Sequence, residues 1–250
     1  MNKASNKSCS IIIPCFNESN NLEKLIDLCK TNLCSRNIEV ILIDNGSTDS
    51  SQNILSKIPP KDNYLKTYRL RKNLGYGHGI LFGLSKAHGD FLGWTHADLQ
   101  TDPLDVVEGF ELINNTNEFV KGTRKGRPLL DNFITIGMSF FESILFKNFL
   151  WDINAQPTLF HRSFFEIWQD PPKDWSIDLF AYSFAKKNGL TVKRIEVLFP
   201  DRIAGTSSWN TGLASRIYLI IRTISFSRLL RMKFKDLSSF ENSPSKNNKG

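Results

Sequence analysis

Three polar side chains follow an apolar segment at alternate positions, and their types suit a metal ion. Residues 91–95 (FLGWT) predict a strand, after which come His96, Asp98 and Gln100. In an extended backbone, alternate side chains point to the same side, so these three can converge on one ion. A hard divalent cation on a diphosphate needs only one or two protein ligands, since phosphate and water supply the rest. A single His or Asp at a strand end more often accepts hydrogen bonds, but three converging groups predict a metal–diphosphate site.

Two further motifs contain glycine and polar residues. In residues 44–49 (DNGSTD), Asp44 can accept a hydrogen bond from a nucleobase or a ribose, although a plain strand-to-helix turn explains the motif equally well. Residues 73–79 (NLGYGHG) are similar to a dinucleotide-binding loop but fail its spacing, because Ile80 and Phe82 stand where the third glycine would be. For this second motif, a flexible loop that enters a helix remains an alternative.

The elements that must position these motifs alternate between short apolar runs and helical patterns. We expect strands over residues 10–14, 38–44, 64–70, 91–95 and 119–121 and helices over residues 20–33, 48–57, 77–87 and 103–114. Asp102 and Pro103 have the residue types of an N-cap and a first helical position. This alternation predicts an α/β fold with a mostly parallel sheet covered on both faces. Ligands then bind at the carboxyl ends of the strands, near Pro14, Asp44, Leu70 and Thr95.

The second half of the chain has a different pattern. Residues 131–151 carry large apolar side chains on about a third of a helical wheel, opposite a polar face with Ser139 and Glu142. We expect strands at 157–162 and 191–199 and a helix at 177–188. Residues 211–235 mix Ile and Leu with Arg and Lys, which predicts a basic amphipathic helix or helix pair. The predicted organisation is one α/β domain over residues 8–210, a helical segment over 211–236 and a disordered tail over 237–250.

Composition restricts the class of protein. The 250 residues are 40% hydrophobic and 23% charged, which is typical of a folded chain, and the net charge of +7 favours an anionic partner. The four cysteines fit neither a disulfide framework nor a zinc site, so reduced thiols are expected. No stretch has the roughly 18 uncharged apolar residues of a membrane span. We therefore expect a cytoplasmic location, with peripheral attachment to the inner face of a membrane as an option.

Seven motifs occur in an order that resembles a known family. They are PCFNES at 14–19, IDNGSTD at 43–49, NLGYGHG at 73–79, HADLQTDP at 96–103, KGTR at 121–124, DINAQPTLFHR at 152–162 and DRIAGTSSW at 201–209. Together they are similar to family 2 glycosyltransferases, and in particular to the branch of dolichol- and polyprenol-phosphate sugar transferases. The resemblance covers residues 9–210.

The resemblance implies a GT-A fold and an inverting sugar transfer from a UDP- or GDP-sugar, assisted by Mg²⁺ or Mn²⁺. By motif, the residues that would surround the base and ribose are Pro14, Phe16, Glu18 and Asp44. Asn73, Gly75 and Ala97 would belong to the same nucleotide-sugar site. Asp98, also assigned to catalysis, and Gln100 would hold the metal. Arg124 would lie near the phosphates, and Arg202 would close over the donor or acceptor phosphate. A planar guanidinium suits phosphate oxygens.

Two positions depart from the family pattern. His96 stands where the family usually has an acid, which gives HAD in place of DAD. Histidine can still bind a metal and would favour Mn²⁺ over Mg²⁺, or Asp98 and Gln100 suffice without it. Asn45 replaces the second acid of the family's DDGS-type turn, so we assign it no metal role. A catalytically weakened sugar-nucleotide-binding protein is therefore one alternative function.

The acceptor decides whether a general base is needed. A polyprenyl phosphate is already ionised, whereas a hydroxyl of a surface polysaccharide or lipopolysaccharide requires a carboxylate to take its proton. For that second acceptor class, Asp178 is the first candidate base and Asp174 the second, with charges at a helix N-terminus as the equally good structural explanation. The two amphipathic segments favour a lipid-linked acceptor and contact with an anionic membrane. Nucleic-acid binding through the basic cluster at 121–127 is not expected, because the sequence shows no stacking platform.

Overall fold

The computed structural model describes residues 7–36, 38–59, 62–126, 129–199 and 213–241. Its centre is a seven-stranded sheet in the order β3-β2-β1-β4-β6-β5-β7. The strands are β1 (Cys9–Cys15), β2 (Ile38–Asp44), β3 (Leu65–Arg69), β4 (Phe91–Trp94), β5 (Glu118–Lys125), β6 (Thr158–His161) and β7 (Thr191–Leu198). All neighbouring strands are parallel except β6, which runs antiparallel to β4 and β5. The predicted α/β class with a mostly parallel sheet is confirmed.

The central strands form where the sequence is apolar on both faces. Every residue of β2 is buried, and the Ile11, Ile12 and Ile13 side chains of β1 are completely so. Strands of this kind must be covered by helices on both sides. Pro14 pairs with Ile43 and Cys15 with Asp44, so β1 and β2 end together. The motifs that follow these strands therefore lie at one edge of the sheet.

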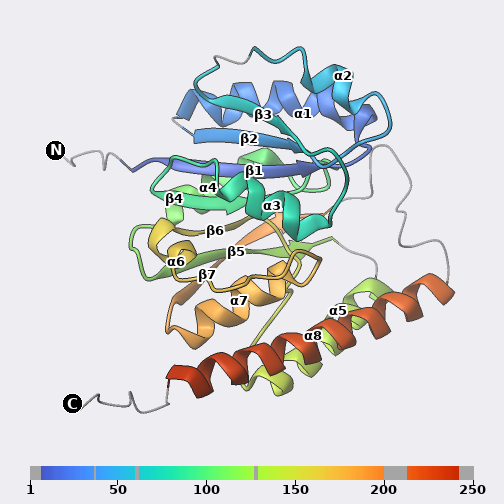
Figure 1. The fold of residues 1–250 in the computed structure, drawn as a ribbon, viewed down its shortest axis with the longest axis vertical. Helices are drawn as coiled ribbons and strands as arrows, with labels where there is room; N and C mark the ends of the chain where they lie inside the picture. Colours follow the sequence, from blue (N-terminus) through green and yellow to red (C-terminus); the bar gives the residue numbers. More distant parts are fainter. Residues whose placement is uncertain (1–6, 37, 60–61, 127–128, 200–212, 242–250) are drawn as a thin grey trace, which may run out of the picture.

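Helices cover the two faces and complete two separate hydrophobic cores (Figure 1). One face packs against α1 (Ser19–Asn32), α2 (Ser51–Leu55) and α4 (Pro103–Leu112). The other packs against α3 (Tyr76–Leu84), α6 (Arg162–Glu166) and α7 (Ile177–Lys187). A short 3-10 helix, η1 (Cys34–Arg36), precedes β2. The sequence patterns missed η1, the short α6 and the reversed direction of β6.

Two long helices run side by side beyond the α7 layer, α5 (Leu129–Phe146) and α8 (Leu213–Glu241) (Figure 1). From Leu213 on, the segment predicted as a helix or helix pair is one helix, and this helix continues past Ser238 into the segment predicted as tail; residues 211–212 and 242–250 lie outside the described part. The helix expected over 131–151 ends early, at Phe146, because Lys147 adopts a left-handed φ of 54°.

The α5 helix lies with its polar face inward. Ser139 and Glu142 are buried, whereas Phe133 and Phe140 are 69% and 68% exposed. The buried carboxyl of Glu142 accepts a hydrogen bond from Ser227 of α8, with 3.1 Å between the oxygens. The apolar stripe of α5 therefore faces away from the protein, opposite to the usual orientation of an amphipathic helix. Within the described residues, no helix is both long and apolar enough to span a bilayer.

The α5–α8 contact predicts a pH-dependent stability. Burial raises the pKa of Glu142 from 4.5 to about 7. The folded protein thus holds the Glu142 proton more tightly than the unfolded chain does. The contribution of this group to the free energy of unfolding is therefore complete below pH 4.5 and is lost as the pH rises through 7. Between pH 5 and pH 8, this group should lower the free energy of unfolding of the wild-type protein by about 2–3 kcal/mol. Glu142→Gln should remove that decrease, because its side chain does not titrate. Urea unfolding at pH 5 and at pH 8 measures the decrease, with Glu23→Gln, at an exposed position, as control. If the two variants gained the same free energy of unfolding over wild type at pH 8, the prediction would be contradicted.

Candidate functional site

A cavity of about 380 Å³ opens at the carboxyl ends of β1, β2 and β4, where the sheet topology predicts a ligand. The predicted residues that line it are Pro14, Phe16, Glu18, Asn73, Gly75, His96, Ala97 and Asp98. Cys15, Asn45, Tyr76, Asp174, Trp175 and Arg222 also line it. The structure thus gathers most of the predicted nucleotide-sugar and metal residues from three segments that are far apart in the sequence.

The end of β2 forms the wall beside Pro14. Asp44 is 2% exposed, and its Oδ1 accepts the backbone N–H of Ser47 at 2.8 Å, which makes the turn that Gly46 allows. Its second oxygen lies 3.6 Å from Arg69 Nε, so the carboxylate sits behind the cavity surface. Next to it, the side-chain oxygen of Asn45 is buried and has no hydrogen-bond partner, although its nitrogen donates to Gly75 O at 3.0 Å. An unpaired buried acceptor in a cavity wall is what a ligand donor would satisfy.

The glycine motif has a packing role that neither sequence alternative anticipated. Gly75 has a φ of 114°, and a Cβ there would lie 2.4 Å from the Lys173 carbonyl oxygen; one on Gly77 would lie 2.7 Å from that of Asp174. The two glycines let the start of α3 press against the backbone that precedes α7. This contact brings Tyr76 onto Trp175, with the two rings stacked at 4.2 Å and 10°.

Tyr76 also lines this cavity, next to His96. Its ring lies 5.7 Å from that of His96, and its hydroxyl is buried without a hydrogen-bond partner. Burial, followed by the nearby charges of Asp178 and Asp98, raises the pKa of Tyr76 far above its usual value, so the hydroxyl keeps its proton. Tyr76 is therefore a hydrogen-bond donor available to a ligand, flanked by the indole of Trp175.

The segment after β4 is not extended, contrary to expectation. Leu99 adopts a left-handed φ of 56°, and Thr95 and Thr101 hydrogen-bond side chain to side chain at 3.1 Å, which closes the segment into a loop. His96 and Asp98 line the cavity, but Gln100 is not among its lining residues; its backbone N–H instead donates to Asp98 Oδ1 at 3.2 Å. The expectation that an extended backbone directs His96, Asp98 and Gln100 to one side is therefore wrong. Asp102 caps α4 as predicted, accepting from Leu104 N–H at 2.9 Å.

The remaining donors still suit a divalent cation on a diphosphate. Asp98 supplies a hard carboxylate at the cavity wall, 8% exposed, and one such ligand is enough when phosphates complete the shell. Burial lowers the pKa of His96, which keeps its imidazole neutral and able to bind metal. Among the described residues, no cluster of three His, Cys, Asp or Glu side chains could hold a metal on protein ligands alone. The metal roles of His96, Asp98 and Gln100 remain predictions.

The structure places Asp178 beneath the cavity instead of in its wall. It is 2% exposed, and its Oδ1 accepts hydrogen bonds from Trp94 Nε1 at 3.2 Å, Lys121 Nζ at 2.9 Å and Gln156 Nε2 at 2.7 Å. A carboxylate paired in this way has no path to an acceptor proton. This placement argues against Asp178 as general base, while Asp174 does line the cavity and accepts from Ser176 N–H and Oγ at 2.8 and 2.6 Å.

The two predicted phosphate-binding arginines have different outcomes. Arg124 is not among the residues that line the cavity; its guanidinium binds the Asp152 carboxylate, with Nε 2.9 Å from Oδ1, and lies over the Phe199 ring at 5.2 Å. Arg202 lies outside the described residues. Lys121, the first residue of the basic cluster at 121–127, is completely buried, whereas Lys125 is exposed and Arg127 lies outside the described residues.

Several lining residues escaped the sequence assignment, among them Tyr76, Trp175 and Arg222. Tyr76 stood inside a quoted motif, but only the tight glycine packing shows where its ring lies. Trp175 precedes the helix that carries Asp178, and its exposure of 40% next to a stacked tyrosine is visible only in three dimensions. Arg222 comes from α8, and no spacing rule connects that helix with the strand ends.

Comparison with known proteins identifies the family. Residues 10–171 match the model of glycosyl transferase family 2, which covers more than half of the chain. The chain therefore belongs to this family, and the predicted family and enzyme class are confirmed.

The curated proteins that the chain matches include undecaprenyl-phosphate 4-deoxy-4-formamido-L-arabinose transferases. That of Salmonella choleraesuis (strain SC-B67) is 31% identical over 122 residues, which cover 45% of this chain and 37% of the relative. That of Yersinia pestis (strain Pestoides F) is 34% identical over 119 residues, covering 43% and 36%. The chain thus matches little more than a third of the length of these relatives.

Among solved structures, glucosyl-3-phosphoglycerate synthase of Mycobacterium tuberculosis in complex with UDP has a TM-score of 0.66 at 16% identity, covering 89% of this chain and 80% of the other. The same enzyme with Mn²⁺, UDP and glucosyl-3-phosphoglycerate has a TM-score of 0.65, with the same identity and coverage. This likeness shows the fold, which is the GT-A fold expected from the resemblance.

The buried Lys121–Asp178 pair predicts a large effect on stability. Lys121→Met should leave the Asp178 carboxylate without its counter-charge and lower the free energy of unfolding by about 3–5 kcal/mol. Adding Asp178→Asn to this variant should restore part of the loss, because the unpaired charge is then removed. Lys125→Met, which breaks the exposed pair with Glu196, serves as control and should cost less than about 1 kcal/mol. Urea unfolding of the four proteins measures the effect; similar losses for Lys121→Met and Lys125→Met would refute it.

Proposed function

We propose that this protein transfers a sugar from a UDP- or GDP-sugar to a phosphate-bearing, lipid-linked acceptor, with inversion at the anomeric carbon and assistance from Mn²⁺ or Mg²⁺. The observation that carries the proposal is that one cavity is lined both by Pro14, Phe16 and Glu18 and by His96 and Asp98. A nucleoside fits the first group and a metal-bound diphosphate the second. The complex of the mycobacterial synthase with UDP and Mn²⁺ supports a ligand of this kind.

In this proposal, Asp98 holds the metal, with His96 beside it. The bound ion would neutralise the charge that develops on the departing nucleoside diphosphate. The side-chain oxygen of Asn45 accepts a hydrogen bond from the nucleoside end of the donor, and the Tyr76 hydroxyl donates one to the sugar or phosphate. These are the two buried groups of the wall that lack a partner in the described structure. Both are fixed before the donor arrives, so little reorganisation is needed.

The acceptor is a phosphate rather than a sugar hydroxyl in this proposal. An ionised phosphate oxygen attacks in line without a general base, and Asp178, the first candidate for a base, is held by Lys121, Trp94 and Gln156. The names of the Salmonella and Yersinia relatives, which specify undecaprenyl phosphate, support the same class. Transfer to a polysaccharide hydroxyl would instead have to use Asp174, whose Oδ1 already accepts two hydrogen bonds from Ser176.

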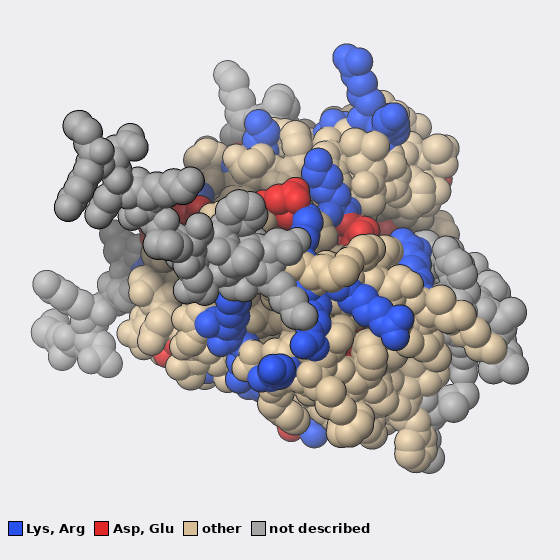
Figure 2. All heavy atoms as spheres, turned by 60° about the horizontal axis from the view of Figure 1, so that its bottom comes forward, with Lys and Arg blue, Asp and Glu red and all other residues tan. Residues whose placement is uncertain are grey.

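A lipid-linked acceptor requires contact with a membrane, for which α5 and α8 are suited. Exposed apolar side chains from both helices form what we call the apolar face: Phe133, Ile136, Phe140, Ile144, Ile217, Ile221, Leu229 and Met232. Figure 2 shows Lys and Arg side chains gathered on this side of the molecule. Apolar and basic side chains on one helix pair favour peripheral binding to an anionic bilayer.

Donor binding tests the proposal directly. Asp98→Ala should abolish the Mn²⁺-dependent part of UDP or GDP binding, with at least a tenfold rise in Kd, because the carboxylate that bridges protein and metal is lost. Isothermal titration with and without MnCl₂ measures this. The exposed Asp27→Ala on α1 is the matched control and should bind as wild type does. Undiminished metal-dependent binding by a folded Asp98→Ala protein would sink the assignment of the site.

Membrane contact has a separate test. The wild-type protein should co-sediment with phosphatidylcholine vesicles that contain phosphatidylglycerol, and less so with phosphatidylcholine alone, because the basic groups attract anionic lipid. Phe140→Glu should reduce the bound fraction several-fold, since it places a charge in the apolar face. Tyr64→Glu, at an exposed aromatic site near β3, should have no effect. Equal binding by the two variants, or no binding by wild type, would exclude this surface.

A further inference from the structure

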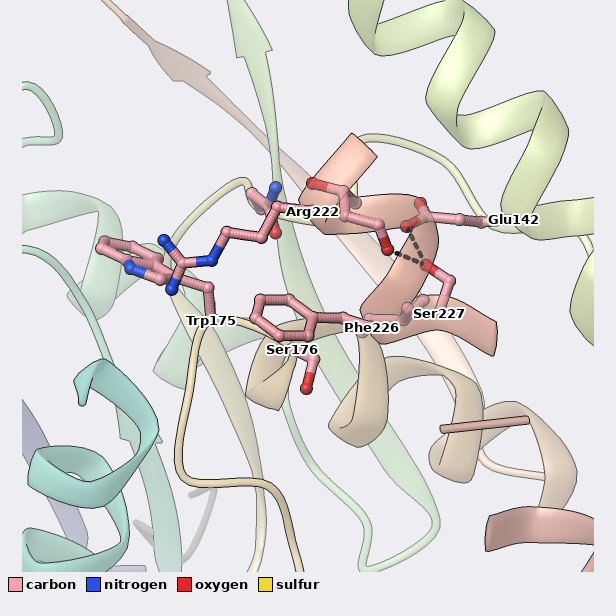
Figure 3. Close-up of a pocket in the computed structure, with 9 residues that line it drawn as sticks. Glu142, Trp175, Ser176, Arg222, Phe226 and Ser227 are labelled. Carbon is pink, nitrogen blue, oxygen red and sulfur yellow. Dashed lines mark hydrogen bonds between the residues drawn. The ribbon is translucent and has the colours of Figure 1, made fainter. Parts of the chain in front are cut away.

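A second cavity, of about 220 Å³, lies between α5, α7 and α8 and adjoins the first. Trp175 and Arg222 line both cavities. Figure 3 shows Arg222 extending from α8 to lie beside the Trp175 indole, with Phe226 of the same helix below it. The guanidinium also lies 5.1 Å from the Phe226 ring centre. The two cavities therefore meet at this arginine.

The second cavity combines one basic side chain with apolar and weakly polar surface. Arg222 is the only basic residue among the described lining residues, and it stands where the two cavities meet. Leu179 and Phe226 provide apolar surface, and Thr223 and Ser227 carry hydroxyls. Glu142, which lies away from the Arg222 guanidinium in Figure 3, is buried and hydrogen-bonded to Ser227. A ligand that fits this lining has an anionic group at the arginine and an apolar part beside it.

We propose that the second cavity receives the acceptor, with Arg222 binding its phosphate and the apolar lining receiving the first part of its hydrocarbon chain. This inference rests on the proposed function, which supplies the acceptor class but not its place in the structure. A guanidinium binds phosphate oxygens through charge-assisted hydrogen bonds in a fixed plane, and its contact with Phe226 orients that plane.

The position of Arg222 favours the acceptor over the donor. In the first cavity, the nucleoside end is formed by Pro14 and Phe16, and Asp98 comes next at the ends of the strands. Arg222 comes instead from α8 and, together with Trp175, lines both cavities, so it stands where the second cavity begins. A phosphate held there enters from the side of α5 and α8, the helices that carry the apolar face. The hydrocarbon chain then passes from the membrane into the cavity without crossing the donor.

The test uses farnesyl phosphate as a soluble probe and farnesol as its uncharged counterpart. Isothermal titration of the full chain should show that wild type binds farnesyl phosphate at least tenfold more tightly than farnesol. Arg222→Gln should remove this preference and leave the affinity for UDP with Mn²⁺ within twofold of wild type. Arg222→Lys should retain an intermediate preference, because the charge remains while the planar geometry is lost. Arg228→Gln, an exposed arginine on the same helix, is the matched control and should keep the full preference.

A second variant tests the cavity independently of the charge. Thr223→Trp should fill the space and weaken both farnesyl phosphate and farnesol at least tenfold, while UDP binding is kept. Loss of UDP binding in Arg222→Gln would assign the arginine to the donor diphosphate and overturn the proposal. Unchanged farnesyl phosphate binding in both variants would overturn it as well. If the proposed function failed instead, wild type would not bind UDP with Mn²⁺, a result that is separate from these outcomes.

Discussion

The position of the cavity depends on one buried carboxylate, that of Asp178. It accepts hydrogen bonds from Trp94 on β4, Lys121 on β5 and Gln156 just before β6, while its own backbone begins α7. A buried charge is tolerated only when it is paired and hydrogen-bonded, so these four segments must meet at this point in the folded protein. Trp175 precedes α7 in the same loop, which means that the contact also fixes the aromatic wall above it.

Sequence patterns located the donor end of the site for a physical reason. The strands β1, β2 and β4 are apolar on both faces, and parallel strands of this kind present their following loops at one edge, which brought Pro14 and Asp98 together as expected. Local patterns failed where backbone conformation or distant partners decide. The left-handed Leu99 makes the segment after β4 a loop instead of an extended chain, and Asp178 resembled an accessible acid because its partner Lys121 is far away in the sequence.

The α5 helix shows a different limit. Its periodicity correctly predicted a helix with one apolar and one polar face, but periodicity does not say which face is inward. Here the buried face is polar, since Ser139 and Glu142 meet α8, while Phe133 and Phe140 remain exposed. In water, this orientation forgoes the stabilisation that burial of these apolar side chains would give. An exposed apolar surface of this kind usually marks an interaction site. The outward orientation of the apolar side chains of α5 is therefore best explained by the proposed contact with an apolar environment, the membrane.

The two cavities differ in where their lining residues lie relative to the family match. Most residues of the first cavity lie within residues 10–171, which match the family, whereas the second cavity takes most of its lining from residues beyond this range. In the proposed function, the metal and nucleoside are held in one geometry, and strand ends provide rigid positions for that purpose. The proposed acceptor instead meets side chains of α8. Under that proposal, substitutions on α8 alter which acceptor is bound without displacing the residues at the strand ends, so acceptor selection and donor chemistry belong to different parts of the fold.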